Sequence, residues 1–416
     1  MMNNRPPNPT GPTGLLSLWL SSLTPSDILE TIKTRAKYLL LDGVGCALVG
    51  AHLPWSEKAA KVHLGLERFG GTCDVVGWEK KFTPLLVALV NGTFIQGFEL
   101  DDWHSDAPVH SNAIIIPSLF SAAAAQNQSS TSNGTKFTVE PRVSNALHGA
   151  HMFTMGWHLG AVFRGSDSAA AVSKMFALDA GAIEDALGIA CTQACGLMSA
   201  HFESEVKRMQ HGFAARNGLI AALLAKGGYV GIKMGLEKEP RFLQDEISRE
   251  LGETRKIEGV RVKPYAAMAV THGVVDCVKI LQKEHPDLMN DLEGVENVTL
   301  GIGAERSLTS MVGREVMPRQ FQSDKLERDE IWTLMGKVSC VQDDGLEGGI
   351  GATVAEVVWK NGKAAEARVK DGRGVDPELS NEEMVEKWRG LMKGVIDDKR
   401  LDGLRRPVLG LRSWTT

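Results

Sequence analysis

The apolar pattern of this chain changes its period once, near residue 295, and that change constrains the fold more than any other feature. From residue 14 to residue 285 apolar residues recur at the spacing of an amphipathic helix, and strand signals are rare. Thr24-Pro25-Ser26-Asp27 and Thr83-Pro84 each combine a capping residue with a proline, which indicates a helix start. Further helices are expected over 112–125, 181–200, 212–228 and 271–284.

After residue 295 the pattern is typical of strands. The segment 297–303, NVTLGIG, alternates and is rich in β-branched residues. The runs ATVAEVVWK and KAAEARVKD flank Asn361-Gly362, which predicts a β-hairpin with a two-residue turn. The segment 382–396 returns to helical spacing. The sequence therefore predicts a large helical domain, a smaller α/β part, and a C-terminal helix that rejoins the first domain.

Charge and cysteine content exclude several classes of function. The net charge of −5 argues against a nucleic acid as partner, and an anionic substrate would need a locally positive pocket. No run of 18 apolar residues occurs, so no membrane span is expected, and the N-terminus lacks the features of a signal or transit peptide. The six cysteines form no CxxC pair, which favours free thiols in a reducing compartment. We expect a cytoplasmic protein, with a mitochondrial location as the weaker alternative.

The stretch 98–118, FELDDWHSDAPVHSNAIIIPS, places acids and histidines between two apolar helices. Its polar members are Glu99, Asp101, Asp102, His104, Asp106 and His110. One interpretation is a solvated loop whose aspartates cap helices. A second is acid–base catalysis by a histidine that a carboxylate holds. A metal site is a third, although the stretch has neither HxH nor HExxH spacing and we expect no metal.

Three other segments carry candidate site residues. His158 lies in GWHLG, where glycines would let a ligand approach the backbone closely. Lys207 and His211 are four apart in SEVKRMQHG and would share one helix face, as an anion site or as a solvated basic face. The segment RVKPYAAMAVTHG brings a lysine, a phenol and a histidine near the predicted junction of the two parts, namely Lys263, Tyr265 and His272.

These segments together resemble the MmgE/PrpD family, and most closely its fungal cis-aconitate decarboxylase branch. The resemblance rests on RAKYLLLDGVGCALVGAHLPWSEK, FELDDWHSDAPVHS, GWHLGAVF, EDALGIACTQACGLMSA, VKRMQHGFAARNGL and RVKPYAAMAVTHG. It implies a mainly α fold, in which a large all-helical domain carries a smaller α/β lid and the active site lies between them. On this basis we expect a helical domain over 14–262, a lid over 263–375, and C-terminal helices over 376–416 that return to the helical domain.

The resemblance also implies a function. Members are homodimers that need no metal or organic cofactor and act on small tricarboxylates. By position it suggests Asp101 or Asp102 with His110 and His158 as catalytic residues, and Lys207, His211, Lys263, Tyr265 and His272 as substrate-binding residues. The leading hypothesis is a decarboxylase of cis-aconitate or an alkyl-substituted relative, with an itaconate-type product, in secondary metabolism. The alternatives are a dehydratase of 2-methylcitrate or a longer alkylcitrate, and a catalytically inactive homologue.

Two segments depart from the family pattern. Residues 125–136 are polar and low in complexity where the family has an apolar helix. After Ser310 the chain runs directly into Met311-Val312-Gly313, so a helix that carries a tyrosine in the family has no counterpart here. Loss of a helix exposes apolar surface on its neighbours, which is the reason for keeping the inactive alternative.

Overall fold

The computed structural model divides the chain into two units, each with its own core. It describes residues 6–8, 10–67, 70–105, 107, 109–126, 152, 155–202, 204–233, 235–236, 247–253, 256–302 and 328–410. The helical unit comprises Met1–Gly97, Asp101–Val260 and Glu383–Thr416, and the smaller unit comprises Phe98–Leu100 and Arg261–Glu382. The polar segment after residue 126 and the junction at 310–325 lie outside the described residues.

The first half of the helical unit begins with α1 (Pro12–Ser22), the 3-10 turn η1 (Pro25–Asp27), α2 (Glu30–Gly50) and α3 (Pro54–Leu66). A short antiparallel pair, β1 (Cys73–Val75) and β2 (Lys80–Phe82), precedes α4 (Pro84–Ile95), the short β3 (Trp103–His104) and α5 (Asn112–Ala125). The side chains of α4 are buried on every face from Leu86 to Ile95, which makes it a central helix of the core.

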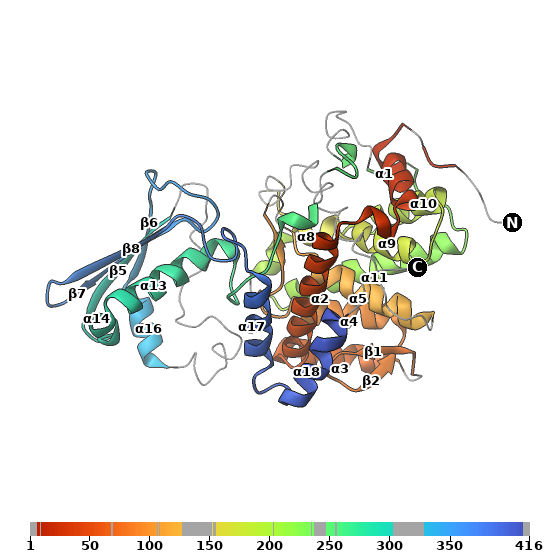
Figure 1. The fold of residues 1–416 in the computed structure, drawn as a ribbon. Coiled ribbons are helices and arrows are strands. Elements are labelled where there is room, and N and C mark those ends of the chain that lie inside the picture. The colour runs from red at the N-terminus through yellow and green to blue at the C-terminus, as the bar shows by residue number, and fades with distance from the viewer. Residues whose placement is uncertain are drawn as a thin grey trace. The chain divides into compact units, whose positions relative to one another are not determined.

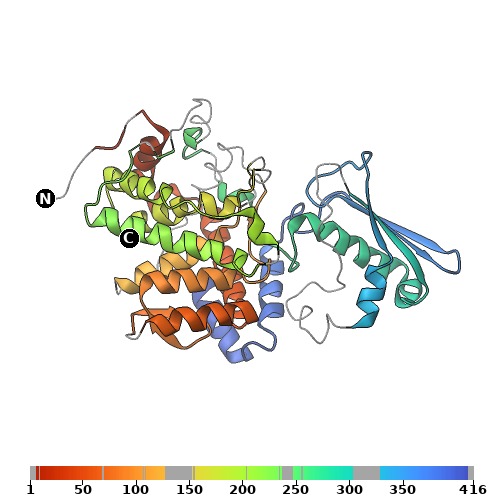
Figure 2. The same ribbon diagram turned by 180° about the vertical axis from the view of Figure 1, so that it is seen from behind.

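The second half continues with α8 (Leu159–Val162), α9 (Gly165–Met175), α10 (Ala180–Cys191), η3 (Met198–His201), α11 (Lys207–Lys226), η4 (Lys256–Gly259) and β4 (Val260–Arg261). Helix α11 packs against α4, α9 and α10, and α4 packs against α5 (Figures 1 and 2). Late in the chain, α18 (Asp398–Leu409) packs on α2, and Trp388 of α17 (Asn381–Met392) lies against Gly45.

Glycines bring α4 and α11 close together. A Cβ added at Gly212 would lie 2.2 Å from the carbonyl oxygen of Leu89, and one at Gly92 would lie 2.9 Å from the Cα of Gly212. Because a side chain at either position would collide with backbone, these two helices can approach this closely only with glycine there. The close packing fixes the position of α11, whose first two turns carry Lys207, Gln210 and His211.

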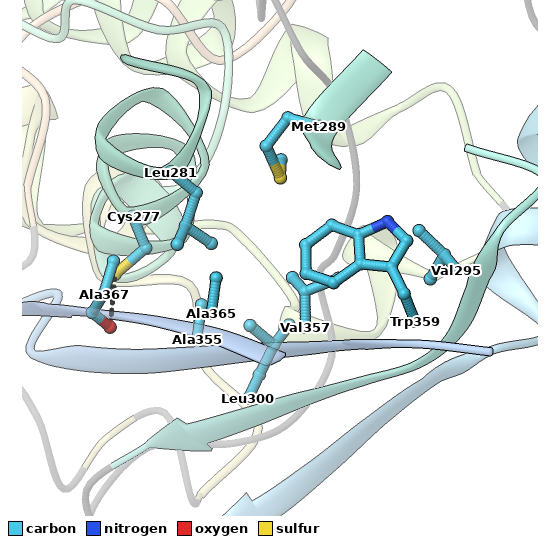
Figure 3. Packing of buried hydrophobic residues seen from close by; sticks show 10 residues of the cluster. All are labelled: Cys277, Leu281, Met289, Val295, Leu300, Ala355, Val357, Trp359, Ala365 and Ala367. Atoms are coloured by element: carbon cyan, nitrogen blue, oxygen red, sulfur yellow. Dashed lines mark hydrogen bonds between the residues drawn. The ribbon is translucent and has the colours of Figure 1, made fainter. Parts of the chain in front are cut away.

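The smaller unit is a four-stranded sheet with helices packed against it. Its first part runs through η5 (Ala269–Thr271), α13 (His272–Glu284), α14 (Pro286–Asn290), β5 (Val295–Ile302) and α16 (Asp329–Met335). The strands β6 (Val338–Gln342), β7 (Thr353–Trp359) and β8 (Ala364–Val369) follow, in the sheet order β6-β5-β7-β8. The β5–β6 pair is parallel, and the β5–β7 and β7–β8 pairs are antiparallel. Cys277 and Leu281 of α13 pack onto Ala355, Val357 and Trp359 of the sheet (Figure 3).

The structure confirms a mainly α chain with a strand-rich part after residue 295, and it corrects several local predictions. The helix predicted for 181–200 ends at Cys191, after which the chain turns through Gly196 at a φ of +122°. Thr24 and Asp27 form their capping box on η1, and α2 begins only at Glu30. The hairpin has a three-residue loop instead of two, because Trp359 faces Lys363 and Gly362 has a φ of +80°.

Among the described helices, no single one is both long and apolar enough to cross a bilayer, although α2 and α3 together reach that length and apolarity as a pair that is bent by 85°.

Candidate functional site

The two neighbouring aspartates before α5 have different tasks. Asp102 is fully buried, and its two carboxylate oxygens accept hydrogen bonds from the backbone N–H groups of Ser111 and Asn112, each at 2.8 Å. It therefore caps the first turn of α5. Burial and the charge of Asp101 raise the pKa of Asp102 to about 7. Asp101, equally buried, lies 3.2 Å through Oδ2 from Nδ1 of His110. Of the two aspartates suggested as partners of His110, Asp101 is the one that faces its imidazole.

Four histidines, among them His110, form a cluster in the helical unit. The ring centroids of His158 and His201 are 4.4 Å apart, those of His158 and His211 are 5.2 Å apart, and those of His110 and His211 are 5.4 Å apart. They come from the loop before α5, the N-cap of α8, η3 and α11. His201 was not singled out from the sequence. The helical packing therefore converts four scattered histidines into one cluster.

Three members of this cluster, His158, His201 and His211, are neutral in their ordinary charge state. Burial lowers the pKa of His158 to about 3, and the nearby His201 and Arg164 add to this effect. Burial also lowers the pKa of His201 to about 4 and that of His211 well below its usual range. Within the described residues no group of three or more histidine, cysteine or acidic side chains is arranged to hold a metal ion.

Two glutamines contact the cluster and an arginine acts on it electrostatically, and the sequence did not point to any of the three. The Nδ1 atom of His158 hydrogen-bonds to Oε1 of Gln210, and the Nδ1 atom of His211 hydrogen-bonds to Oε1 of Gln96 at the C-cap of α4. Arg164 is fully buried, and its positive charge contributes to the lowered pKa values of His158 and His211. A glutamine carries no charge and fits no catalytic motif, so only its position in the fold reveals it.

The second glycine of GWHLG, Gly160, makes room for another histidine of the cluster. A Cβ added at Gly160 would lie 2.5 Å from Nε2 of His211, so the missing side chain leaves space for that imidazole. The approach of a ligand to this backbone stays a prediction. His104, in the acidic stretch, is also structural: its Nε2 donates to the carbonyl oxygen of Lys256 at 2.7 Å. Asp106 lies outside the described residues.

The cations predicted around an anion occupy both units. In the helical unit, Lys207 is the first residue of α11, is mostly buried, and has an electrostatic effect on His211. Next to it, Arg208 donates through Nε to the carbonyl oxygen of Gly97 at 3.1 Å and stacks over Trp55. Burial lowers the pKa of Arg208, and the charge of Asp101 opposes that effect.

In the smaller unit, Lys263 is paired with Glu99. The Nζ atom of Lys263, a residue that is 2% exposed, lies 3.5 Å from Oε2 of Glu99 and donates to the Glu99 carbonyl oxygen at 3.2 Å. Glu99 has a φ of +63°, a strained conformation for a residue with a side chain. Strain of this kind is concentrated at functional sites, so Glu99 joins the candidates.

Tyr265 and His272 form a separate network in the smaller unit. The Tyr265 hydroxyl donates to Oδ1 of Asp276 at 2.6 Å and accepts from Nζ of Lys279 at 3.1 Å. Burial and Asp276 raise the pKa of Tyr265. His272 packs edge-on to this ring, with 5.2 Å between centroids, and its Nδ1 lies 3.2 Å from the Arg373 carbonyl oxygen. These partners hold α13 to the loop after β8, and a substrate-binding role for the two residues stays a prediction.

A pocket of about 350 Å³ opens in the helical unit between α3 and the start of α11. Its lining includes Trp55, Val62, Thr93, Arg208 and Met209. The ion pair between Lys58 and Glu205, at 2.6 Å, also lies in its wall.

Comparison with known proteins identifies the family of this chain. The MmgE/PrpD N-terminal domain matches residues 15–248, and the MmgE/PrpD C-terminal domain matches residues 309–405. A protein of Aspergillus oryzae named cis-aconitate decarboxylase-like is 37% identical, over 96% of this chain and 94% of its own length. A cis-aconitate decarboxylase of Aspergillus terreus is 35% identical, over 98% and 94%. The human cis-aconitate decarboxylase is 26% identical, over 52% and 46%.

The alignments also bear on the missing segments. The stretch aligned with the Aspergillus oryzae protein spans 456 positions, which exceeds the 416 residues of this chain. That relative therefore has residues without a counterpart here. With both domain models matched in order and nearly the whole chain aligned, the protein belongs to the MmgE/PrpD family.

Proposed function

We propose that this chain is a carbon–carbon lyase that decarboxylates cis-aconitate, or an alkyl-substituted relative of it, to an itaconate-type product. The observation that carries the proposal is the pair formed by the buried Asp101 and the partly buried His110, in a chain that aligns almost end to end with proteins named cis-aconitate decarboxylase. A carboxylate-held imidazole can carry a proton to carbon, and this is the chemical step that the reaction needs.

The substrate is a trianion, and cations are needed to bind it. Lys207 and Lys263 are our candidates for contacts with its carboxylates. The bond that breaks joins the allylic methylene carbon to its carboxylate, which leaves as CO2. The electron pair of that bond stays on the three-carbon allyl system, next to a remaining carboxylate. A cation beside that carboxylate stabilises the charge as it develops.

A proton must then reach the carbon at the far end of the allyl system. His110 in its imidazolium form is the proposed donor, and Asp101 stabilises that form because an opposite charge close by favours the charged imidazole. The double bond moves to the former methylene carbon, His110 becomes neutral, and solvent returns its proton. One proton is consumed for each CO2 released.

One observation favours a second candidate, a catalytically inactive homologue. The aligned Aspergillus oryzae relative has residues that this chain lacks. Loss of a helix can destabilise a domain by as much as its whole free energy of unfolding. Dehydration of an alkylcitrate remains the alternative chemistry for the same side chains, with proton removal from carbon and protonation of the leaving hydroxyl.

Proton NMR of the purified protein with cis-aconitate distinguishes these candidates. Two new methylene signals of itaconate are expected, together with a rise in pH when the CO2 is purged from a weakly buffered solution. Absence of these signals, from protein whose circular dichroism shows folded helices, would contradict decarboxylation of cis-aconitate. The same samples with alkyl-substituted cis-aconitates and with 2-methylcitrate would then separate a different substrate, dehydration and inactivity.

A further inference from the structure

The side-chain amide of Gln210 is held in one orientation by the backbone. Its Nε2 atom donates to the carbonyl oxygen of Leu197 at 3.0 Å. A carbonyl oxygen can only accept, so the NH2 end of the amide must face Leu197 and the oxygen end must face the other way. That other neighbour is Nδ1 of His158. The usual ambiguity between the two ends of a glutamine amide is thereby removed.

An oxygen at this place determines which ring nitrogen of His158 carries the proton. The amide oxygen can only accept, so Nδ1 must donate and the neutral ring has its hydrogen on Nδ1. Nε2 is then left with a lone pair. The backbone of His158 is fixed as well, since its N–H donates to the carbonyl oxygen of Gly196 at 3.2 Å and its own carbonyl oxygen accepts from Ala161 at 3.0 Å. Both the ring and the chain are therefore held in position.

His110 has the opposite kind of partner. Its Nδ1 faces the carboxylate of Asp101, which stabilises a charged imidazole, whereas the neutral amide of Gln210 has much less effect on charge. The groups that face His158 from neighbouring elements are His201 of η3, His110, His211 of α11 and Arg164 at the N-cap of α9. Each of these is a cation or can become one, so the surroundings of His158 oppose its protonation.

We propose that Gln210 is a positioning residue that fixes His158 as the Nδ1–H tautomer, so that His158 is a hydrogen-bond acceptor through Nε2 and His110 alone supplies the proton. The assignment of the proton to His110 rests on the proposed function. The tautomer of His158 is independent of the proposed function, and it is therefore measured first.

The tautomer is read by long-range proton–nitrogen NMR on the full-length protein labelled with ¹⁵N at its histidines. His158→Gln identifies the signals of His158 by their disappearance. We expect a protonated, pyrrole-type nitrogen at Nδ1 and an unprotonated, pyridine-type nitrogen at Nε2, at pH 7 and at pH 5.5. In Gln210→Met, which keeps the size but removes the acceptor, the two nitrogens should shift toward an average of both tautomers.

The variant Gln210→Glu tests the link to charge. A carboxylate in place of the amide should raise the pH at which the His158 ring titrates by about one to three units. Gln193 offers matched controls, because its amide donates to the backbone carbonyl groups of Ile189 and Asn217. Gln193→Met and Gln193→Glu should leave the His158 signals unchanged. Circular dichroism of every variant confirms that it is folded.

Several results would overturn the proposal. These are a pyridine-type Nδ1 in the wild-type protein, an unchanged tautomer in a folded Gln210→Met, or an unchanged His158 titration in Gln210→Glu. If turnover is present, Gln210→Met should lower kcat with little change in KM. If cis-aconitate is not converted but the nitrogen shifts are as expected, the proposed function fails while the assignment of the tautomer stands.

Discussion

At the scale of single residues, two adjacent aspartates with equal burial have different roles because their carboxylates face different groups. Asp102 accepts two backbone N–H groups and belongs to the start of α5, whereas Asp101 faces the imidazole of His110. The sequence placed both in one candidate group, since adjacent carboxylates cannot be distinguished by residue type. The difference leads to opposite expectations for their variants.

Asp101→Asn should lower turnover, and Asp102→Ala should lower stability. An amide at residue 101 cannot stabilise the His110 imidazolium, so kcat is expected to fall by roughly 10²- to 10⁴-fold with a nearly unchanged unfolding midpoint. Asp102→Ala leaves two buried N–H groups of α5 without an acceptor and should cost about 1–3 kcal/mol in the free energy of unfolding. Urea titration and steady-state kinetics of both variants check this, and the reverse pattern would exchange the two assignments.

The neutral histidines make stability depend on pH. The pKa values of about 3 for His158 and about 4 for His201 lie below the 6.5 of an unperturbed histidine, so the folded state binds fewer protons than the unfolded state between these values. Their stabilisation is complete above pH 6.5 and is lost as the pH falls toward 4. Asp102 acts in the opposite direction, because its pKa of about 7 lies above 3.8 and its contribution is lost as the pH rises.

The histidines should dominate, because the pKa values of three of them are lowered, against one aspartate whose pKa is raised. We expect the urea concentration at the unfolding midpoint of the wild-type protein to decrease as the pH is lowered from 6.5 to 4.5. In His158→Asn that fall should be smaller by on the order of 2 kcal/mol in unfolding free energy, since each pH unit corresponds to about 1.4 kcal/mol for one proton. Equal slopes for the two proteins would show that His158 titrates normally.

At this scale the sequence identified residues that the fold brings together, but not the side chains that they contact. His110, His158, Lys207 and His211 were found because acids, imidazoles and lysines in short motifs point to chemistry, and the fold places them in one unit. Gln96, Gln210 and Arg164 were missed because an amide has no motif of its own and a buried arginine reads as surface charge. A candidate role for Glu99 arises only from its backbone strain and its contact with Lys263.

At the scale of elements, the helix period was the reliable signal and the ends of elements were not. The spacing of apolar residues predicted α5 with its observed bounds and α13 to within one residue. It extended α10 past Cys191 because the following residues keep an apolar pattern, although there the chain must turn to bring the Leu197 carbonyl to Gln210. The hairpin was predicted correctly, but Asn361-Gly362 did not reveal that Lys360 joins the loop.

The contact between α4 and α11 gives a prediction at this scale. Gly212→Ala would place a Cβ 2.2 Å from the Leu89 carbonyl oxygen, so the helices must separate. We expect a loss of about 1–3 kcal/mol in unfolding free energy, as for other overpacked cores, and a fall in turnover because Gln210 and His211 move with α11. Differential scanning calorimetry and kinetics measure the two effects.

Gly65→Ala is the matched control, since Gly65 lies inside α3 and an added Cβ there would have nothing within 4 Å. Alanine should stabilise that helix by about 0.5–1 kcal/mol because it restricts the unfolded chain and favours helix. If both variants have the same stability, the methyl group added at Gly212 does not force α4 and α11 apart, and the prediction is wrong.

At the scale of the whole molecule, residues more than 300 positions apart close the helical unit. Trp388 of α17 is buried, and a Cβ at Gly45 of α2 would lie 2.9 Å from its ring. Beside it, Nζ of Lys387 lies 2.5 Å from Oδ1 of Asp42, and both side chains are less than 5% exposed. Burial raises the pKa of Asp42, and Lys387 opposes this shift. The sequence predicted that the C-terminal helix rejoins the first domain, but it gave no sign of this ion pair.

The buried ion pair should matter far more for stability than a surface pair of similar length. Lys387→Met leaves the Asp42 carboxylate buried without its cation and should cost about 3–5 kcal/mol in unfolding free energy. Adding Asp42→Leu should recover most of that loss, because two apolar residues of similar size need no charge compensation. Lys58→Met, which removes the exposed pair with Glu205 at 2.6 Å, should cost less than about 1 kcal/mol. Urea titration of the four proteins decides the matter: if Lys387→Met costs no more than Lys58→Met, the link between α2 and α17 depends on the packing of Trp388 and not on charge.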